Sequence, residues 1–272
     1  MAEKPHFSPS QIGMFIRCGV QWEFRYGQGL KIPPAVAMIL GGSTDVGVSA
    51  NLTSKKDTGD LLPLEKVQDI TRDAVNEKWG YEGVWLMPEE EEKTWQVVKG
   101  ETVDTAVSLA GLHHARLAPI IQPAHIQRSI TVEIDGFPYD LMGIIDVQEK
   151  PAKGQKAGRV RDTKCKINRA PAKGVADTSI QLTSYAAMVK AVDGDFPELC
   201  LDFLVNYKKG PEEIVQPTTR NQADYEAFFR TMELMALSIE KGVFHRADPD
   251  SWIFSRRFCG YADRCKYFGG RP

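Results

Sequence analysis

The sequence predicts an α/β fold in which a mixed β-sheet is flanked by helices. The spacing of apolar residues gives the core order helix, three strands, helix, strand between residues 95 and 207. This order is typical of a sheet covered by helices. Acidic residues fall on the central strands, so a candidate site is expected on the sheet itself.

Helices are expected along most of the first 120 residues. Ser8 can cap a helix that has Pro9 in its first turn. A turn at Gly41–Gly42 is expected to precede a second helical region. Residues 64–78 and 95–116 show two further helical patterns.

The core elements follow from runs rich in apolar and β-branched residues. Strands are expected at residues 129–134, 139–147, 158–164 and 199–207. Further helices are expected at residues 179–192 and 223–242, the second ending at a glycine. The whole chain is expected to form one domain, in three parts: a helical region (1–120), an αβββαβ core (121–210), and a C-terminal helix with a cysteine segment (211–272).

The composition is that of an ordinary soluble globular protein, with 42% hydrophobic and 26% charged residues in 272. No apolar run approaches the length that spans a bilayer, and no signal-peptide pattern is present, so we expect a cytoplasmic protein without membrane association. The net charge of −2 argues against a histone-like protein. It remains compatible with nucleic-acid binding through positive charge concentrated in one groove.

Two carboxylates and a lysine carry most of the chemical information. Asp146 directly follows the apolar run Leu141–Ile145, and Asp162 and Lys164 lie on the next predicted strand. Residues two apart on a strand share a face, so Asp162 and Lys164 point to the same side. Paired carboxylates can hold a hard divalent cation, which activates water, and a lysine adds positive charge beside a phosphate. The pattern indicates metal-dependent phosphodiester hydrolysis.

A D-x-K triplet by itself is weak evidence, because charged residues alternate on many solvated strands. The context favours a site, since an aspartate just after a buried strand is costly unless it is paired or bound to metal. The alternative is that Asp146 opens a turn, because Gln148–Pro151 follows closely.

The five cysteines divide into two groups. Cys165 and Cys200 fall within or beside predicted strands and are expected to be inert core thiols. Cys18, Cys259 and Cys265 lie near the two ends of the chain, each with aromatic and basic neighbours. An odd number in a chain with no secretion signal argues against a disulfide framework.

Five short motifs occur in a recognisable order: Ser8–Ser10 with Cys18 and Phe24–Tyr26, then Gly143–Asp146, Asp162–Lys164, Gln181–Tyr185, and Trp252–Cys265. With these motifs the chain resembles the RecB-like branch of the PD-(D/E)xK nuclease superfamily. The resemblance is greatest to phage and CRISPR-associated exonucleases that carry an iron–sulfur cluster. It implies a restriction-endonuclease-like fold, a DNA substrate (single strands or duplex ends), and a bacterial cytoplasm, or a host cytoplasm if the gene belongs to a phage.

The resemblance also implies roles for individual residues. Asp146 and Asp162 would bind Mg²⁺ or Mn²⁺ together with the backbone carbonyl of Thr163. Lys164 would orient or activate the attacking water.

A helix that follows these strands would contribute Gln181 and Tyr185, which would position DNA and the metal–water network. These two residues are four apart and share a helix face, and the alternative is an exposed polar pair. The chain departs from the family at Gly41–Asp45, where relatives have a histidine ligand and Asp45 stands in its place. Asp45 is therefore either a further ligand of a hard cation or a helix cap.

The cysteine segment is a second departure. Relatives supply four cysteines to the cluster, whereas this chain offers Cys18, Cys259 and Cys265, with Arg256 where another cysteine is expected. Three interpretations stay open: an iron–sulfur cluster with one non-cysteine ligand, a different metal, or packed thiols without metal. A residual or labile cluster site is the interpretation that we favour from the sequence.

The favoured hypothesis is a metal-dependent DNA exonuclease that acts in recombination, repair or end processing. A second is a DNA-binding or partner-binding module that retains the nuclease scaffold without cleavage. A third is a partner of CRISPR adaptation that trims DNA before integration. The sequence predicts no particular oligomeric state.

Overall fold

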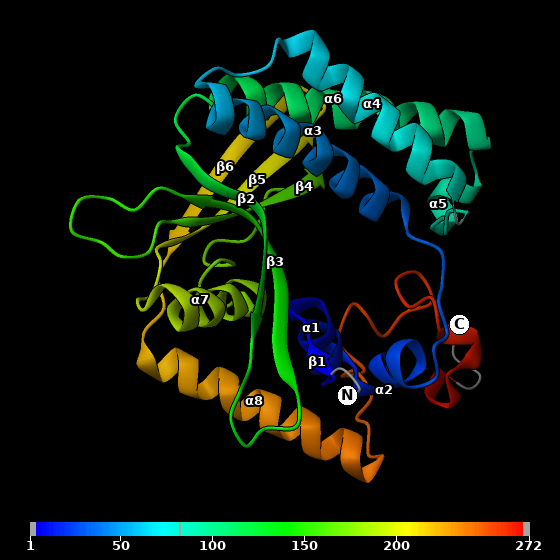
Figure 1. The fold of residues 1–272 in the computed structure, drawn as a ribbon. Coiled ribbons are helices and arrows are strands. Elements are labelled where there is room, and N and C mark those ends of the chain that lie inside the picture. The colour runs from blue at the N-terminus through cyan, green and yellow to red at the C-terminus, as the bar shows by residue number, and fades with distance from the viewer. Residues whose placement is uncertain (1–3, 82, 269–272) are drawn as a thin grey trace.

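The computed structural model describes residues 4–81 and 83–268, and its centre is a six-stranded sheet (Figure 1). The strands are β1 (His6–Phe7), β2 (Pro123–Val132), β3 (Asp140–Glu149), β4 (Val160–Ile167), β5 (Leu199–Tyr207) and β6 (Gly210–Thr218). Their order is β1-β3-β4-β5-β6, with β2 also paired to β3. The pairs β1–β3 and β4–β5 are parallel and the others antiparallel. The prediction of a mixed sheet is confirmed.

Helices cover both faces of this sheet (Figure 1). One face carries α3 (Val36–Thr58), α4 (Leu64–Tyr81) and α6 (Trp95–Arg116). The other carries α1 (Pro9–Arg17), α7 (Ile180–Asp193) and α8 (Gln222–Lys241). The remaining short pieces are α2 (Gly19–Trp22), a π-helical turn (Glu23–Gly27), α5 (Pro88–Glu91) and two 3₁₀ turns (Ala262–Arg264, Lys266–Phe268). Within the described residues, no helix is long and apolar enough to cross a bilayer.

Each face of the sheet has its own apolar core. Leu182 of α7 and Met232 of α8 are fully buried on one side, and Leu52 of α3 and Leu109 of α6 on the other. Burying such side chains removes apolar surface from water on both sides of the sheet, which holds the central strands between two helical layers.

The end of α7 is tied to the sheet by a charged contact. Arg128 of β2 donates two hydrogen bonds to Asp193, both at 2.9 Å, and Gln148 of β3 donates to the same carboxylate at 2.8 Å. Bidentate pairs of this kind fix orientation as well as distance. They set the position of α7 relative to β3.

Most predicted elements are confirmed, and α6 has the bounds that were predicted. Ser8 caps α1 as expected, accepting a hydrogen bond from the Gln11 backbone N–H at 3.3 Å. The strands β1 and β6 were not predicted. β1 has two residues, and β6 is an edge strand that contains proline and glutamate, the residues that natural sheets use to protect an edge.

The predicted turn at Gly41–Gly42 is wrong, because both glycines lie inside α3. Gly42 faces α4, as does Gly47 further along the helix, whereas a Cβ atom on Gly41 would meet open space. A Cβ atom on Gly42 would lie 2.8 Å from Lys78 Nζ, and one on Gly47 would lie 2.0 Å from Thr71 Oγ1. The missing side chains let α3 approach α4 closely, a benefit that outweighs the low helix propensity of glycine.

Candidate active site

The strands β3 and β4 part at the two predicted acidic residues. Their antiparallel ladder ends at the pair Val147–Arg161. One further step in this register would place Asp146 opposite Asp162, but that pair does not join the ladder. The Thr163 backbone N–H instead donates to Asp146 Oδ2 at 3.4 Å. The parting of the strands therefore occurs where the two carboxylates meet.

The two carboxyl groups lie close enough to share a hydrogen bond when one of them is protonated. Burial, then the charge of Asp162, raises the pKa of Asp146 well above its ordinary value. Burial also raises the pKa of Asp162, although Lys164 opposes this. A buried carboxylate whose charged form is disfavoured by a second carboxylate is unusual in a purely structural pair and typical of functional sites.

Lys164 is the cation of this site. Its Nζ atom lies 2.5 Å from Asp162 Oδ2. Burial alone would lower the pKa of Lys164, but the carboxylates of Asp162 and Asp146 raise it above its ordinary value. The side chain is therefore held as an ammonium, which suits it to orient a water molecule and to stabilise negative charge rather than to remove a proton.

A buried arginine cross-links the strands next to the point where they part. Arg161 donates to both carboxylate oxygens of Asp202 on β5, at 2.9 and 3.0 Å. It also donates to Glu149 on β3 at 2.6 Å. Because Arg161 precedes Asp162 on β4, these ion pairs hold β3, β4 and β5 together beside the acid pair. Removing one partner would leave a buried charge uncompensated.

Asp45 reaches the site from the middle of α3, so the alternative of a helix cap is wrong. Burial raises the pKa of Asp45, hydrogen bonding from Ser49 lowers it, and the charge of Asp162 raises it. Asp45 also raises the pKa of Asp146. Its charge is therefore felt by both acids of the central strands.

Gln181 and Tyr185 of α7 form a hydrogen-bonded pair. The Gln181 Nε2 atom donates to the Tyr185 hydroxyl oxygen at 2.7 Å. Tyr185 is only 3% exposed, so the alternative of an exposed pair is wrong for this residue. Burial raises the pKa of Tyr185, and the charges of Asp162 and Asp146 raise it further. The tyrosine is thus a neutral hydroxyl group within the electrostatic field of the acid pair.

The donor set fits a divalent cation held by two carboxylates. The Asp162 side chain is completely buried, and its Oδ1 atom has no hydrogen-bond partner among residues 4–81 and 83–268. A buried carboxylate oxygen without a donor is costly unless a cation satisfies it. In the same described residues, no three aspartate, glutamate, histidine or cysteine side chains come close enough to form a metal site alone. The candidate ligands are therefore Asp146 and Asp162, with Asp45 as a third charge at longer range.

Sequence reasoning missed three side chains that contact or influence Asp45. Gln127 and Ser49 donate hydrogen bonds to its carboxylate, and the charge of Lys78 lowers its pKa. Ser49 lies one helical turn after Asp45, a spacing that could have suggested it. Gln127 and Lys78 come from other elements, and nothing in their local sequence marks them.

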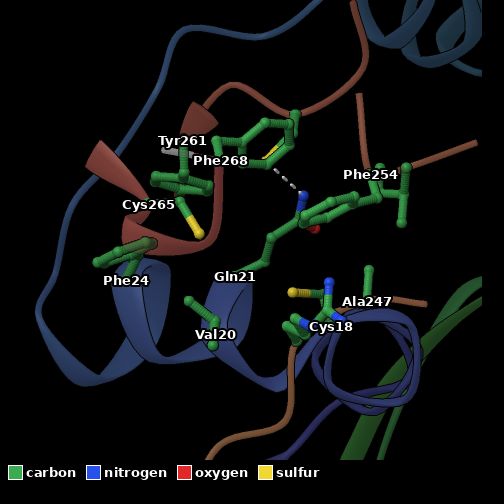
Figure 2. Close-up of a pocket in the computed structure, with 12 residues that line it drawn as sticks. Cys18, Val20, Gln21, Phe24, Ala247, Phe254, Tyr261, Cys265 and Phe268 are labelled. Atoms are coloured by element: carbon green, nitrogen blue, oxygen red, sulfur yellow. Dashed lines mark hydrogen bonds between the residues drawn. The ribbon is translucent and has the colours of Figure 1, made fainter. Parts of the chain in front are cut away.

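The cysteines of the two chain ends meet in one place (Figure 2). Cys18, Cys259 and Cys265 line a common void of about 10 Å³, and the Gln21 side chain lines the same void. The Gln21 Nε2 atom donates to Cys259 Sγ at 3.1 Å. A void of this size holds about one water molecule.

These residues do not fit a four-cysteine iron–sulfur cluster. Arg256 occupies the position expected for the fourth thiolate, and its guanidinium forms an ion pair with Asp263. Burial raises the pKa of the Cys259 thiol, against the hydrogen bond from Gln21.

Contacts between aromatic side chains hold together the segments that carry these cysteines. Phe24 lies against Tyr261 with ring centroids 5.4 Å apart, and Phe254 stacks on Phe268 at 4.5 Å. These rings join the N-terminal and C-terminal segments around the thiols.

The other two cysteines behave as predicted for core thiols. Burial raises the pKa of Cys165 to about 11 and that of Cys200 to about 12. All five cysteines lie in the described part of the chain and are free thiols.

Comparison with known sequences decides the family. The sequence profile of the PD-(D/E)XK nuclease superfamily matches residues 6–266. The chain belongs to the PD-(D/E)XK nuclease superfamily. The mixed sheet and its flanking helices are accordingly a restriction-endonuclease-like fold. Membership of the PD-(D/E)XK superfamily supports nuclease activity and implies DNA as the substrate.

Solved structures also match the chain, at low sequence identity. The chain is similar to the crystal structure of a presumed exonuclease from Eubacterium rectale, with 13% identity, a TM-score of 0.56, and coverage of 90% of this chain and 85% of that chain. A structure of SSO0001 matches with 9% identity and a TM-score of 0.43, over 98% of this chain and 88% of that chain. No curated protein matches the sequence.

Proposed function

We propose that this PD-(D/E)XK protein is a metal-dependent exonuclease that degrades single-stranded DNA. The observation that carries the proposal is the meeting of Asp146 and Asp162 at the parting of β3 and β4, with the Lys164 ammonium 2.5 Å from Asp162. A divalent cation such as Mg²⁺ or Mn²⁺, when bound, would lower the pKa of a water molecule and neutralise charge on the phosphate.

The side chains of the site have distinct tasks in this proposal. Asp146 and Asp162 would hold the cation, with the Thr163 backbone carbonyl as a further oxygen ligand. Lys164, which keeps its proton, would orient the attacking water and stabilise the negative charge that develops on the phosphate. Tyr185, also protonated, would donate a hydrogen bond from its buried position, and Gln181 fixes the orientation of its hydroxyl group.

A groove beside Gln181 supports a single-stranded substrate. It has a volume of about 840 Å³ and is bounded by α1, the segment after α2, the start of α3, the residues before α5, the start of α7 and the C-terminal segment. Arg17 and Arg25 line it, and no carboxylate of the described residues does. Tyr26 and Trp252 line it as well, 38% and 61% exposed. Arginines suit a phosphate backbone, and exposed aromatic rings suit unpaired bases.

The walls of this groove favour exonuclease action. Met87 and Phe258 both line it, and between the segments that carry them Arg257 pairs with Glu89 at 2.9 Å. The C-terminal segment thus contacts the segment of α5 beside the groove. A strand with a free end can thread between such segments, whereas the middle of a strand requires this contact to open.

The test compares linear and circular single-stranded DNA, incubated with Mn²⁺ and then with Mg²⁺. We expect the linear strand to be degraded from an end and the circle to persist. Asp146→Ala and Lys164→Ala should abolish degradation, while Asp135→Ala and Lys153→Ala, which change exposed residues outside the site, should leave it intact. Unchanged degradation by the first two variants would rule the proposal out, and cleavage of the circle would replace exonuclease by endonuclease action.

A second function is favoured by the lack of a third close ligand among the described residues. In that case the protein binds single strands without cutting them in either metal. A fluorescent oligonucleotide that is bound but stays intact would support it. Roles in recombination, repair or CRISPR adaptation would follow from either activity, and co-purification with an integrase would favour the last.

A further inference from the structure

Gln127 of β2 has an unusual backbone conformation beside the acid pair. Its neighbours Ile126 and Arg128 pair with Val147 and Ile145 of β3, so Gln127 lies level with Asp146. Its φ angle is +50°, which places it in the left-handed region. Among the described residues other than glycine, only Gln127 and Asn168 have a positive φ angle. A strained backbone that persists within a regular strand indicates a contact that compensates for it.

The compensating contact is a closed ring of hydrogen bonds around Asp45. Gln127 Nε2 donates to Asp45 Oδ2 at 3.0 Å and to Ser49 Oγ at 3.1 Å. The Ser49 hydroxyl donates in turn to Asp45 Oδ1 at 3.4 Å. An amide nitrogen carries two protons and a carboxylate only accepts, so the ring is consistent at every atom. Both oxygens of Asp45 are thereby held, one of them from a different element of the fold.

We infer that Gln127 is a positioning residue that holds Asp45 beside the acid pair and so strengthens binding of a divalent cation there. The inference rests on the proposed function, because it assumes a cation between Asp146 and Asp162. The hydrogen bonds from Gln127 and Ser49 hold both oxygens of the Asp45 carboxylate in place. Gln127 therefore fixes the position of a carboxylate near the cation without contacting the cation.

The left-handed backbone at Gln127 allows a substitution that removes the side chain without straining the fold. Gln127→Gly removes the amide and relieves the strain, because glycine accepts a positive φ angle without cost. Asn168→Gly is the matched control, since Asn168 has a φ angle of +52° and lies just beyond the end of β4. Metal-free melting temperatures should stay level or rise in both variants, which shows that neither change damages the fold.

Calorimetric titration with Mn²⁺ then measures the effect on the site. Gln127→Gly should weaken Mn²⁺ binding by about 10- to 100-fold, the usual consequence of losing a residue that supports a metal ligand. Asn168→Gly should bind like the wild type. In the nuclease assay, Gln127→Gly should need more Mn²⁺ for half-maximal rate and recover most of its rate at saturating metal.

Equal Mn²⁺ affinities of the wild type, Gln127→Gly and Asn168→Gly would overturn the inference. If the wild-type protein binds Mn²⁺ through Asp146 but cuts no DNA, the proposed function is wrong. The role of Gln127 in Mn²⁺ binding can still be measured in that case. Wild-type protein that binds no Mn²⁺ would overturn both.

Discussion

The acid site on β3 and β4 and the cysteine pocket at the chain ends both follow sequence motifs of metal proteins, but they differ in how their polar atoms are satisfied. At the acid site a buried oxygen of Asp162 has no hydrogen-bond partner in the described chain, and carboxylates of like charge face each other. In the cysteine pocket, Gln21 donates to Cys259 and the remaining space is about that of one water molecule.

The acid site and the cysteine pocket differ in how much a bound cation would stabilise them, and the reason is electrostatic. Buried carboxylates lose more by remaining unpaired than neutral thiols do, because charge is far more costly than a weakly polar group in a medium of low dielectric constant. Thiols pack as small apolar groups and need no metal for stability. In this chain the acid motif coincides with a buried carboxylate oxygen that has no donor among the described residues, whereas a thiol of the cysteine pocket accepts a hydrogen bond from Gln21.

The largest expected difference is in catalysis. Asp162→Asn should lower the rate of DNA degradation by about 10³-fold or more, because a loss of about 4 kcal/mol of transition-state stabilisation corresponds to three powers of ten. Cys265→Ser should retain activity within about threefold, since the cysteine pocket lies outside the chemistry. Initial rates on a labelled single strand at saturating Mn²⁺ measure both. An equal loss in the two variants would remove the distinction between the sites.

The next difference concerns stability without metal. Burial and the charge of Asp162 raise the pKa of Asp146, so the folded state binds its proton more tightly than the unfolded chain. Stability then falls as pH rises from the ordinary value of about 3.9 through the raised pKa. In a chelating buffer at pH 8, Asp146→Asn should melt a few degrees above the wild type, and the gap should close towards pH 4. The exposed Asp135→Asn serves as control, and an Asp146→Asn protein that melts lower at pH 8 would contradict the assignment of repulsion.

A smaller effect is expected at the joined chain ends. The buried Tyr261 hydroxyl donates to the Leu30 carbonyl oxygen at 2.8 Å. Tyr261→Phe should lower stability by about 1 kcal/mol, equivalent to about 2–4 °C in melting temperature. The decrease should be the same with and without chelator, because this packing does not depend on metal. Thermal denaturation checks it, and a decrease seen only without chelator would indicate a metal in the pocket.

The smallest expected signal is the absorption of protein purified without oxygen. We expect a colourless sample whose iron content equals that of Cys259→Ser prepared in parallel. A broad visible band that disappears in Cys259→Ser would show that the pocket accommodates a cluster after rearrangement, and would reverse the comparison of the two sites.

Local sequence was enough to predict the elements with strong periodicity or clear caps. The helix over residues 95–116 was predicted with its observed bounds, and the pairing of Gln181 with Tyr185 followed from their spacing of four. The prediction of a turn at Gly41–Gly42 was wrong because glycine marks turns more often than close contacts between helices. Gly42 faces Lys78 of α4, a neighbour that no local pattern reveals.

The order of the motifs along the chain predicted the nuclease family, which the profile match confirms, and it predicted the acid pair and its lysine as site residues. These predictions depend on residue type and on spacing within single strands. The tertiary structure decided that Asp45 lies within a helix, that Gln127 holds it, and that Gln21 donates to Cys259 in the void that the cysteines share. Each of these depends on side chains from separate elements, and their distances arise only when helices and strands pack against one another. Periodicity records which face of an element is buried, but it does not record which neighbour that face will meet.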